Sequence, residues 1–258
     1  TGAAHGTTVA RFMEMRLILH TIYVRDKNII AGKLSEMFVF TKDLITKFIK
    51  TATPVVFNDV MWIGGITVYF IAYSKLGTNA TATMQISNTI NNAFNIFAIG
   101  IAIASSIVIG NKIGAGEEKE AKEVAIKINI FGIALGVLVG VVFFIASPFI
   151  PLMFKITPET KANVITVLRI MSVLVPVRFF GIVQIIGVLR GGGDVVYAIL
   201  VELIAVWGIG VPLSFIGAVY LNYPITIVYA LTCLEEPFKM ISTIPRLLSG
   251  KWIRNLVK

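Results

Sequence analysis

The sequence predicts an all-α, polytopic transmembrane helix bundle of about seven helices, and two observations support this. Of the 258 residues, 56% are hydrophobic and only 14% are charged, whereas soluble proteins average about 25% charged residues. The apolar residues also gather in runs of roughly 20, which is the length that crosses a bilayer as a helix. The ten-residue alternating segments that indicate a membrane β-barrel do not occur.

The chain opens with a helix of mixed character, predicted over residues 3–24. Arg11, Glu14 and Arg16 lie at spacings that allow partial charge pairing. A helix of this kind is a poor lone anchor and is expected to pack within a bundle. Because the first residue is Thr1 and no signal-peptide n-region follows it, we interpret the chain as a fragment.

The remaining chain alternates apolar runs with basic connections. A basic, amphipathic segment at residues 25–50 predicts a linker on the cytoplasmic surface. Lysines and arginines return in alternate loops and in the tail at 248–258, which the positive-inside rule places on the same side. The surplus of 23 basic over 14 acidic residues therefore indicates membrane anchoring and not nucleic-acid binding. Crossing helices are predicted over residues 51–73, 82–109, 124–145, 162–189, 195–219 and 224–244.

Asp59 is the first candidate functional residue, because it lies within the apolar run at residues 53–73. A charge at the centre of a spanning helix costs about 2.5 to 3.5 kcal/mol on insertion scales, so such residues usually face protein or a water-filled cavity. The alternative is an acid near the helix end that reaches headgroup water. On a helical wheel, one arc of about 100° holds Asn58, Asp59, Trp62, Tyr69 and Tyr73.

The next predicted helix carries a second polar stripe, made mainly of amides. Interhelical hydrogen bonding, worth about 0.6 kcal/mol per contact, is one explanation, and lining of a hydrated pathway is the other. Two neighbouring polar stripes favour the pathway. The aromatic residues of the first stripe suit contact with an organic cation, but membrane-interface aromatics have the same appearance. An arc of about 80° on the second helix holds Gln85, Asn88, Asn92, Asn95 and Ser106.

Expected roles follow for four of the other charged residues within the predicted spans. Arg178 is expected to have a structural or snorkelling role, and Glu202 a solvated or helix-packing role near the cytoplasmic end. Glu235 and Lys239 stand four residues apart and are expected to neutralise each other. The sequence contains no Walker, HExxH or GxSxG motif and no clustered Cys/His set, so neither an enzyme nor a metal or cofactor site is predicted.

Seven stretches, which together cover nearly the whole chain, are informative in their order and spacing. They are GAAHGTTVAR, PVVFNDVMW, LGTNATATMQISNTINN, GNKIGAGEEKEAKE, GVLRGGGDVVYAIL, VWGIGVPLS and KMISTIPRLLSGKWIRN. In this order they resemble the second half of a multidrug and toxic compound extrusion (MATE) transporter, a cation-coupled antiporter built from two six-helix lobes. The order and spacing make the resemblance specific.

The resemblance implies a division of the chain. Residues 1–24 would be the last helix of the amino-terminal lobe, 25–50 the linker between the lobes, 51–247 the six-helix carboxy-terminal lobe and 248–258 a basic tail. It further implies that the lobes rock about a central cavity in a bacterial cytoplasmic membrane, exporting organic cations in exchange for H⁺ or Na⁺. The missing amino-terminal lobe of the same protein would be the chain's partner.

The resemblance also implies roles for single residues. Asp59 matches an acidic position of the lobe's first helix, and Gln85, Asn88 and Asn92 match cavity-facing polar positions of the next. Some members carry an acid in the helix equivalent to 162–189, and this sequence has none there. Whether Asp59 binds the driving ion or the substrate therefore stays open. The predicted binding set is Asp59, Asn58, Trp62, Tyr69, Gln85, Asn88 and Asn92.

Two other functions remain as alternatives. A lipid-linked oligosaccharide flippase of related fold would need a basic cavity for anionic diphosphates, with Arg178 as the candidate contact, whereas the stripes found here hold amides and an acid. A truncated membrane fragment or assembly subunit without transport activity is the third possibility.

Overall fold

The computed structural model describes residues 2–25 and 41–254, and the chain divides into two compact units, Thr1–Thr51 and Ala52–Lys258. The first unit contains α1 (Gly2–His20), which continues as one π-helical segment, η1 (Thr21–Arg25). Arg11 donates to Glu14 at 2.7 Å, which confirms this part of the predicted charge pairing. Much of the predicted linker, residues 26–40, lies outside the described residues.

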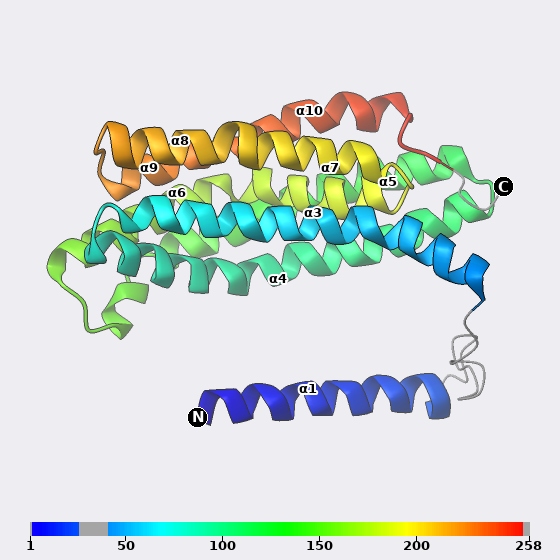
Figure 1. Ribbon diagram of the computed structural model, residues 1–258, viewed down its shortest axis with the longest axis horizontal. Helices are drawn as coiled ribbons and strands as arrows, with labels where there is room; N and C mark the ends of the chain where they lie inside the picture. Colours follow the sequence, from blue (N-terminus) through cyan, green and yellow to red (C-terminus); the bar gives the residue numbers. More distant parts are fainter. Residues whose placement is uncertain (1, 26–40, 255–258) are drawn as a thin grey trace. The chain divides into compact units, whose positions relative to one another are not determined.

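The second unit is helical throughout, and Figure 1 shows its long helices running alongside one another. With the broken pair α9 and α10 counted as one, the described parts of the two units contain seven long helical stretches, which confirms the predicted all-α fold of about seven helices. After α1, the elements are α3 (Lys42–Ser74), α4 (Thr78–Gly114), α5 (Glu118–Ala146), η2 (Ile150–Met153), α6 (Pro158–Ile182) with η3 (Val183–Arg190), the continuous stretch α7 (Val195–Leu203), η4 (Ile204–Gly210), α8 (Val211–Phe215) and η5 (Ile216–Tyr220), and then α9 (Ile225–Thr232) and α10 (Glu235–Ser249).

Five helices in the described residues are long and apolar enough to cross a membrane. They are Ala52–Ser74, Thr78–Gly114, Glu118–Ala146, Pro158–Arg190 and Val195–Tyr220. Large apolar side chains on their outer faces are exposed, such as Ile130 and Leu138 of α5 at 62% and 61%. An apolar surface of this kind is stable against lipid and not against water. The protein is therefore a multi-pass membrane protein.

The last predicted span, residues 224–244, is not one continuous helix. It is broken at Cys233 and Leu234 into α9 and α10. Pro237 explains the break, because a proline has no N–H for the carbonyl four residues earlier, here that of Cys233, and its ring would clash with that carbonyl. The break places Glu235 and Glu236 in the first turn of a new helix inside the bundle.

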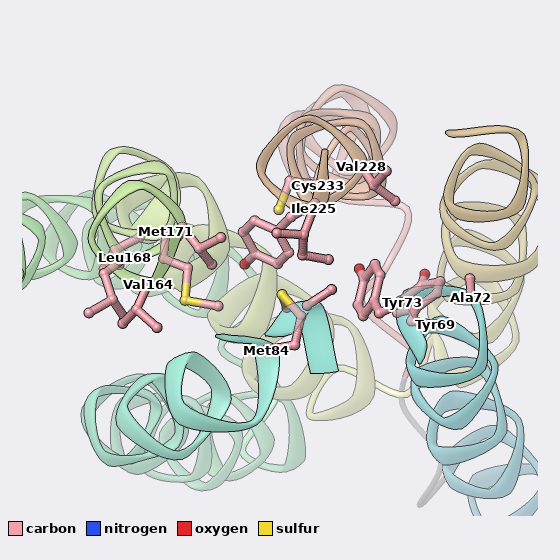
Figure 2. Packing of buried hydrophobic residues seen from close by; sticks show 14 of the residues in the cluster. Tyr69, Ala72, Tyr73, Met84, Val164, Leu168, Met171, Ile225, Val228 and Cys233 are labelled. Carbon is pink, nitrogen blue, oxygen red and sulfur yellow. The ribbon is translucent and has the colours of Figure 1, made fainter. Parts of the chain in front are cut away.

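The core of the bundle is formed mainly by side chains from α3, α4, α6 and α9, with others from α5, η4 and η5. Figure 2 shows Tyr73, Met84 and Ile225 pointing into one space between these helices, with Met171 of α6 beside them. On the other side of α6, the helix approaches α5 at two glycines. A Cβ at Gly140 would stand 2.5 Å from the carbonyl oxygen of Ser172, so the two backbones are in direct contact.

This contact predicts that Gly140→Ala destabilises the fold. The added methyl group must push α6 away from α5, and overpacking of this kind costs about 1–3 kcal/mol. The measurement is the unfolding midpoint of the purified protein in detergent. Gly100→Ala is the matched control, because a Cβ at Gly100 of α4 meets nothing within 4 Å. Equal midpoints for the two variants would contradict the close contact.

Candidate functional site

The Asp59 cluster consists of Asn58 and Asp59 of α3, Arg190 at the end of η3, and Glu202 of α7. Asn58 Nδ2 donates to Glu202 Oε2 at 2.5 Å, and Arg190 Nη2 donates to the same oxygen at 3.2 Å. The second neighbour of Arg190 Nη2 is Asp59 Oδ1, at 3.5 Å. Residues from three helices thus meet around one guanidinium group.

The members of the cluster differ strongly in burial. The Asp59 side chain is 57% exposed, while those of Arg190 and Glu202 are 19% and 15% exposed. Asn58 is buried, and its Oδ1 atom has no hydrogen-bond partner in the described structure. Asp59 and Glu202 are acidic and Arg190 is basic, so with all three ionised the cluster carries one net negative charge.

Two tryptophans lie next to this charge. Trp62 and Trp207 line one narrow pocket together with Asn58 and Glu202. Trp207 Nε1 donates to the carbonyl oxygen of Met61 at 3.1 Å, which fixes the ring against α3. Both tryptophans are partly exposed, and indole faces attract cations. Of the predicted set, Asn58, Asp59 and Trp62 are therefore brought together.

Tyr69 belongs to a different group of side chains, the buried network of Tyr69, Asn91, Arg178, Glu235, Glu236 and Lys239. The Tyr69 hydroxyl donates to Glu235 at 2.6 Å. Lys239 lies 3.4 Å from Glu235 and 3.7 Å from Glu236, which confirms the predicted Glu235–Lys239 pair. As a substrate contact Tyr69 stays a prediction, and its hydroxyl is engaged inside the bundle.

Arg178 completes the buried network from α6. Its Nε donates to Glu236 at 3.0 Å and its Nη1 to Asn91 Oδ1 at 3.0 Å. Two acidic and two basic residues therefore compensate one another. Sequence reasoning missed Glu236 and Asn91 as partners, although a lone arginine in an apolar helix needs an acid and an amide nearby.

The amide stripe of α4 lies only partly in the packed interior. Gln85 and Asn92 are exposed and Asn88 is half-buried. Asn92 stands 14 residues after the start of α4 and Asp59 stands 15 before the end of α3. At 1.5 Å per residue, both are about 21 to 23 Å from the short turn that joins these helices, so they lie at similar depth.

A third group of charges, the tail clamp, closes over the glycine turn that follows Arg190. Asp194 is buried and forms ion pairs with Arg246 at 2.7 Å and with Arg254 at 2.8 Å. The hydrogen bond to Asp194 raises the pKa of Arg246 above its ordinary value. Trp252 is fully buried and packs so closely on Gly192 that any side chain there would collide with it.

Comparison with known proteins decides the family. The sequence model of the MatE family matches residues 54–216, which include the Asp59 cluster. The chain belongs to the MatE family. The transporters of this family are not enzymes, in agreement with the absence of catalytic motifs in the sequence.

The relatives agree with this assignment at low identity. "Uncharacterized transporter YisQ" of Bacillus subtilis is 25% identical over 255 residues, which are 98% of this chain and 55% of that protein. "Probable multidrug resistance protein NorM" of Thermotoga maritima is 21% identical over 265 residues, covering 99% of this chain and 54% of that protein. The chain spans about half the length of the curated relatives it matches.

Solved structures share the fold. A MATE crystal structure in complex with MaL6 superposes with a TM-score of 0.80 at 15% identity, over 97% of this chain and 55% of that one. A MOP superfamily transporter from Pyrococcus furiosus gives a TM-score of 0.73 at 19% identity, over 81% of this chain and 46% of that one. The bundle is thus half of a MATE fold.

The buried network predicts a strong effect of Lys239→Met. Loss of the ammonium group leaves Glu235 and Glu236 with a single basic partner, and breaking a buried pair in this way costs about 3–5 kcal/mol. The measurement is again the unfolding midpoint in detergent. Adding Glu235→Gln to Lys239→Met should recover part of the loss, because it removes the stranded charge.

Lys127→Met is the matched control, because Lys127 and Glu123 form an i,i+4 pair whose side chains are 75% and 70% exposed. Such a pair contributes less than about 1 kcal/mol. A Lys239→Met variant as stable as Lys127→Met would show that the network does not bear on stability.

Proposed function

We propose that the protein performs secondary active efflux of organic cations in exchange for H⁺ or Na⁺ by alternating access, and that this chain supplies the C-terminal half of the cavity. The single observation that supports this most is the exposed carboxylate of Asp59 on a helix long enough to span the membrane. A carboxylate in this setting is stable when it faces water or protein and costly when it faces lipid.

The surroundings of Asp59 suit a positively charged ligand. The Asp59 cluster has a net negative charge, and Trp62 offers an aromatic face next to it. The amides Gln85, Asn88 and Asn92 of α4 add neutral hydrogen-bonding groups, with Asn92 at the depth of Asp59. An anionic lipid diphosphate finds less support, because Arg178 donates to Glu236 and Asn91 and Arg190 to Glu202.

The relatives add weaker support of two kinds. The NorM protein of Thermotoga maritima is named as a probable multidrug resistance protein, and the relatives from Bacillus and Thermotoga are bacterial. These relatives support our proposal that the protein lies in a bacterial cytoplasmic membrane. The other wall of the cavity would come from an amino-terminal lobe of the same protein.

Asp59→Asn is expected to abolish ethidium export, because the amide keeps the shape of the carboxylate but removes its charge. The measurement is ethidium efflux from cells that produce the protein as its own gene encodes it, with membrane insertion checked by fractionation. Glu123→Gln, which removes an exposed acid elsewhere, should leave export unchanged. Export at the normal rate by a membrane-inserted Asp59→Asn protein would exclude Asp59 from the mechanism.

A further inference from the structure

Arg190 stands where a cationic ligand of Asp59 would be expected to stand. Its Nη2 atom lies between two carboxylates, 3.2 Å from Glu202 and 3.5 Å from Asp59. Its Nε atom is buried and has no hydrogen-bond partner in the described structure. A guanidinium group has five N–H donors in a rigid fork, and here that fork is incompletely used.

The two contacts of Arg190 are unequal. Glu202 accepts hydrogen bonds from Arg190 and from Asn58 and is largely buried. The ion pair of Arg190 and Glu202 is therefore stabilised by a second donor and shielded from water. Asp59 is more than half exposed, and its 3.5 Å separation from Arg190 exceeds the usual N–H···O distance of about 2.7 to 3.2 Å. The contact between Arg190 and Asp59 is therefore the one that an incoming cation can replace.

We propose that Arg190 is a built-in competitor of the transported cation at Asp59, and so determines the affinity of the site. In the empty site its guanidinium offsets part of the charge of Asp59. A cation that arrives at Asp59 replaces this contact, while Arg190 stays paired with Glu202. The inference rests on the proposed function, because it concerns the same carboxylate.

The charge count leaves the site with capacity for a cation after Arg190 is included. The cluster holds two acidic residues against one basic residue, and in the neighbouring buried network Arg178 and Lys239 offset Glu235 and Glu236. The pocket that Asn58 and Trp62 line is too narrow for a ligand, so a cation would bind at the exposed side of Asp59.

The test compares the affinity for tetraphenylphosphonium of the wild-type protein and of Arg190→Gln, using the protein as its own gene encodes it, in nanodiscs of neutral lipid. Removing the competitor should lower the Kd about fivefold, which corresponds to about 1 kcal/mol at 1.4 kcal/mol per tenfold change. In an Asp59→Asn background, the same substitution should give no gain. This second comparison separates competition at Asp59 from a general change in the fold.

Arg169→Gln is the matched control, because it removes an exposed arginine from the same continuous helix, where Arg169 lies over the ring of Phe144. It should leave the Kd unchanged. If Arg190→Gln does not fold, Glu202→Gln decides instead: it releases Arg190 to pair fully with Asp59, and the Kd should rise several-fold.

The outcomes distinguish the two proposals. If the wild-type protein binds the cation and Arg190→Gln leaves the Kd unchanged, the inference is overturned and the proposed function stands. A gain in affinity that persists in the Asp59→Asn background overturns the inference in the same way. Absence of binding to the wild-type protein removes the proposed function, and the role of Arg190 with it.

Discussion

The cost of placing charge in an apolar bundle governs how this chain arranges its helices. Each ionised side chain in a spanning segment needs an opposite charge, hydrogen-bond donors or water. Arg178, Glu235, Glu236 and Lys239 meet this need among themselves inside the bundle. Asp59 meets it only in part, through a distant contact with Arg190. This difference separates the charges that hold the helices together from the charge that is available to a ligand.

Much of the fold follows from the sequence because its signals are local. Apolar runs of bilayer length predict the helices, and an i,i+4 spacing predicts the pair of Glu235 and Lys239. The break before Glu235 could also have been predicted, because Pro237 stands in the sequence and a proline disrupts the preceding turn of any helix. The contacts of Arg190 and Arg178 could not be predicted, because each joins residues more than ten positions apart on different helices.

The candidate site shows a second reason why sequence reasoning has limits. A helical wheel projects a helix along its axis and therefore discards depth. Asp59 and Tyr69 share one arc of α3 but are ten residues apart, which is about 15 Å along the helix. Along α3 that distance sets Asp59 apart from Tyr69, so one predicted stripe serves two environments. Asn58 and Trp62, close to Asp59 in sequence, remain with it in space.

The tail clamp has a consequence for how Arg190 can move. The backbone just after Arg190 is anchored by Asp194 to Arg246 and Arg254, and Trp252 covers the turn at Gly192. The turn that follows Arg190 is thus held by residues near the C-terminus. With the following turn held in this way, the guanidinium of Arg190 can change its partner by rotation about its own side-chain bonds. The Arg190 side chain can therefore leave Asp59 when a ligand binds, and the affinity of the site can be set without any rearrangement of the helices.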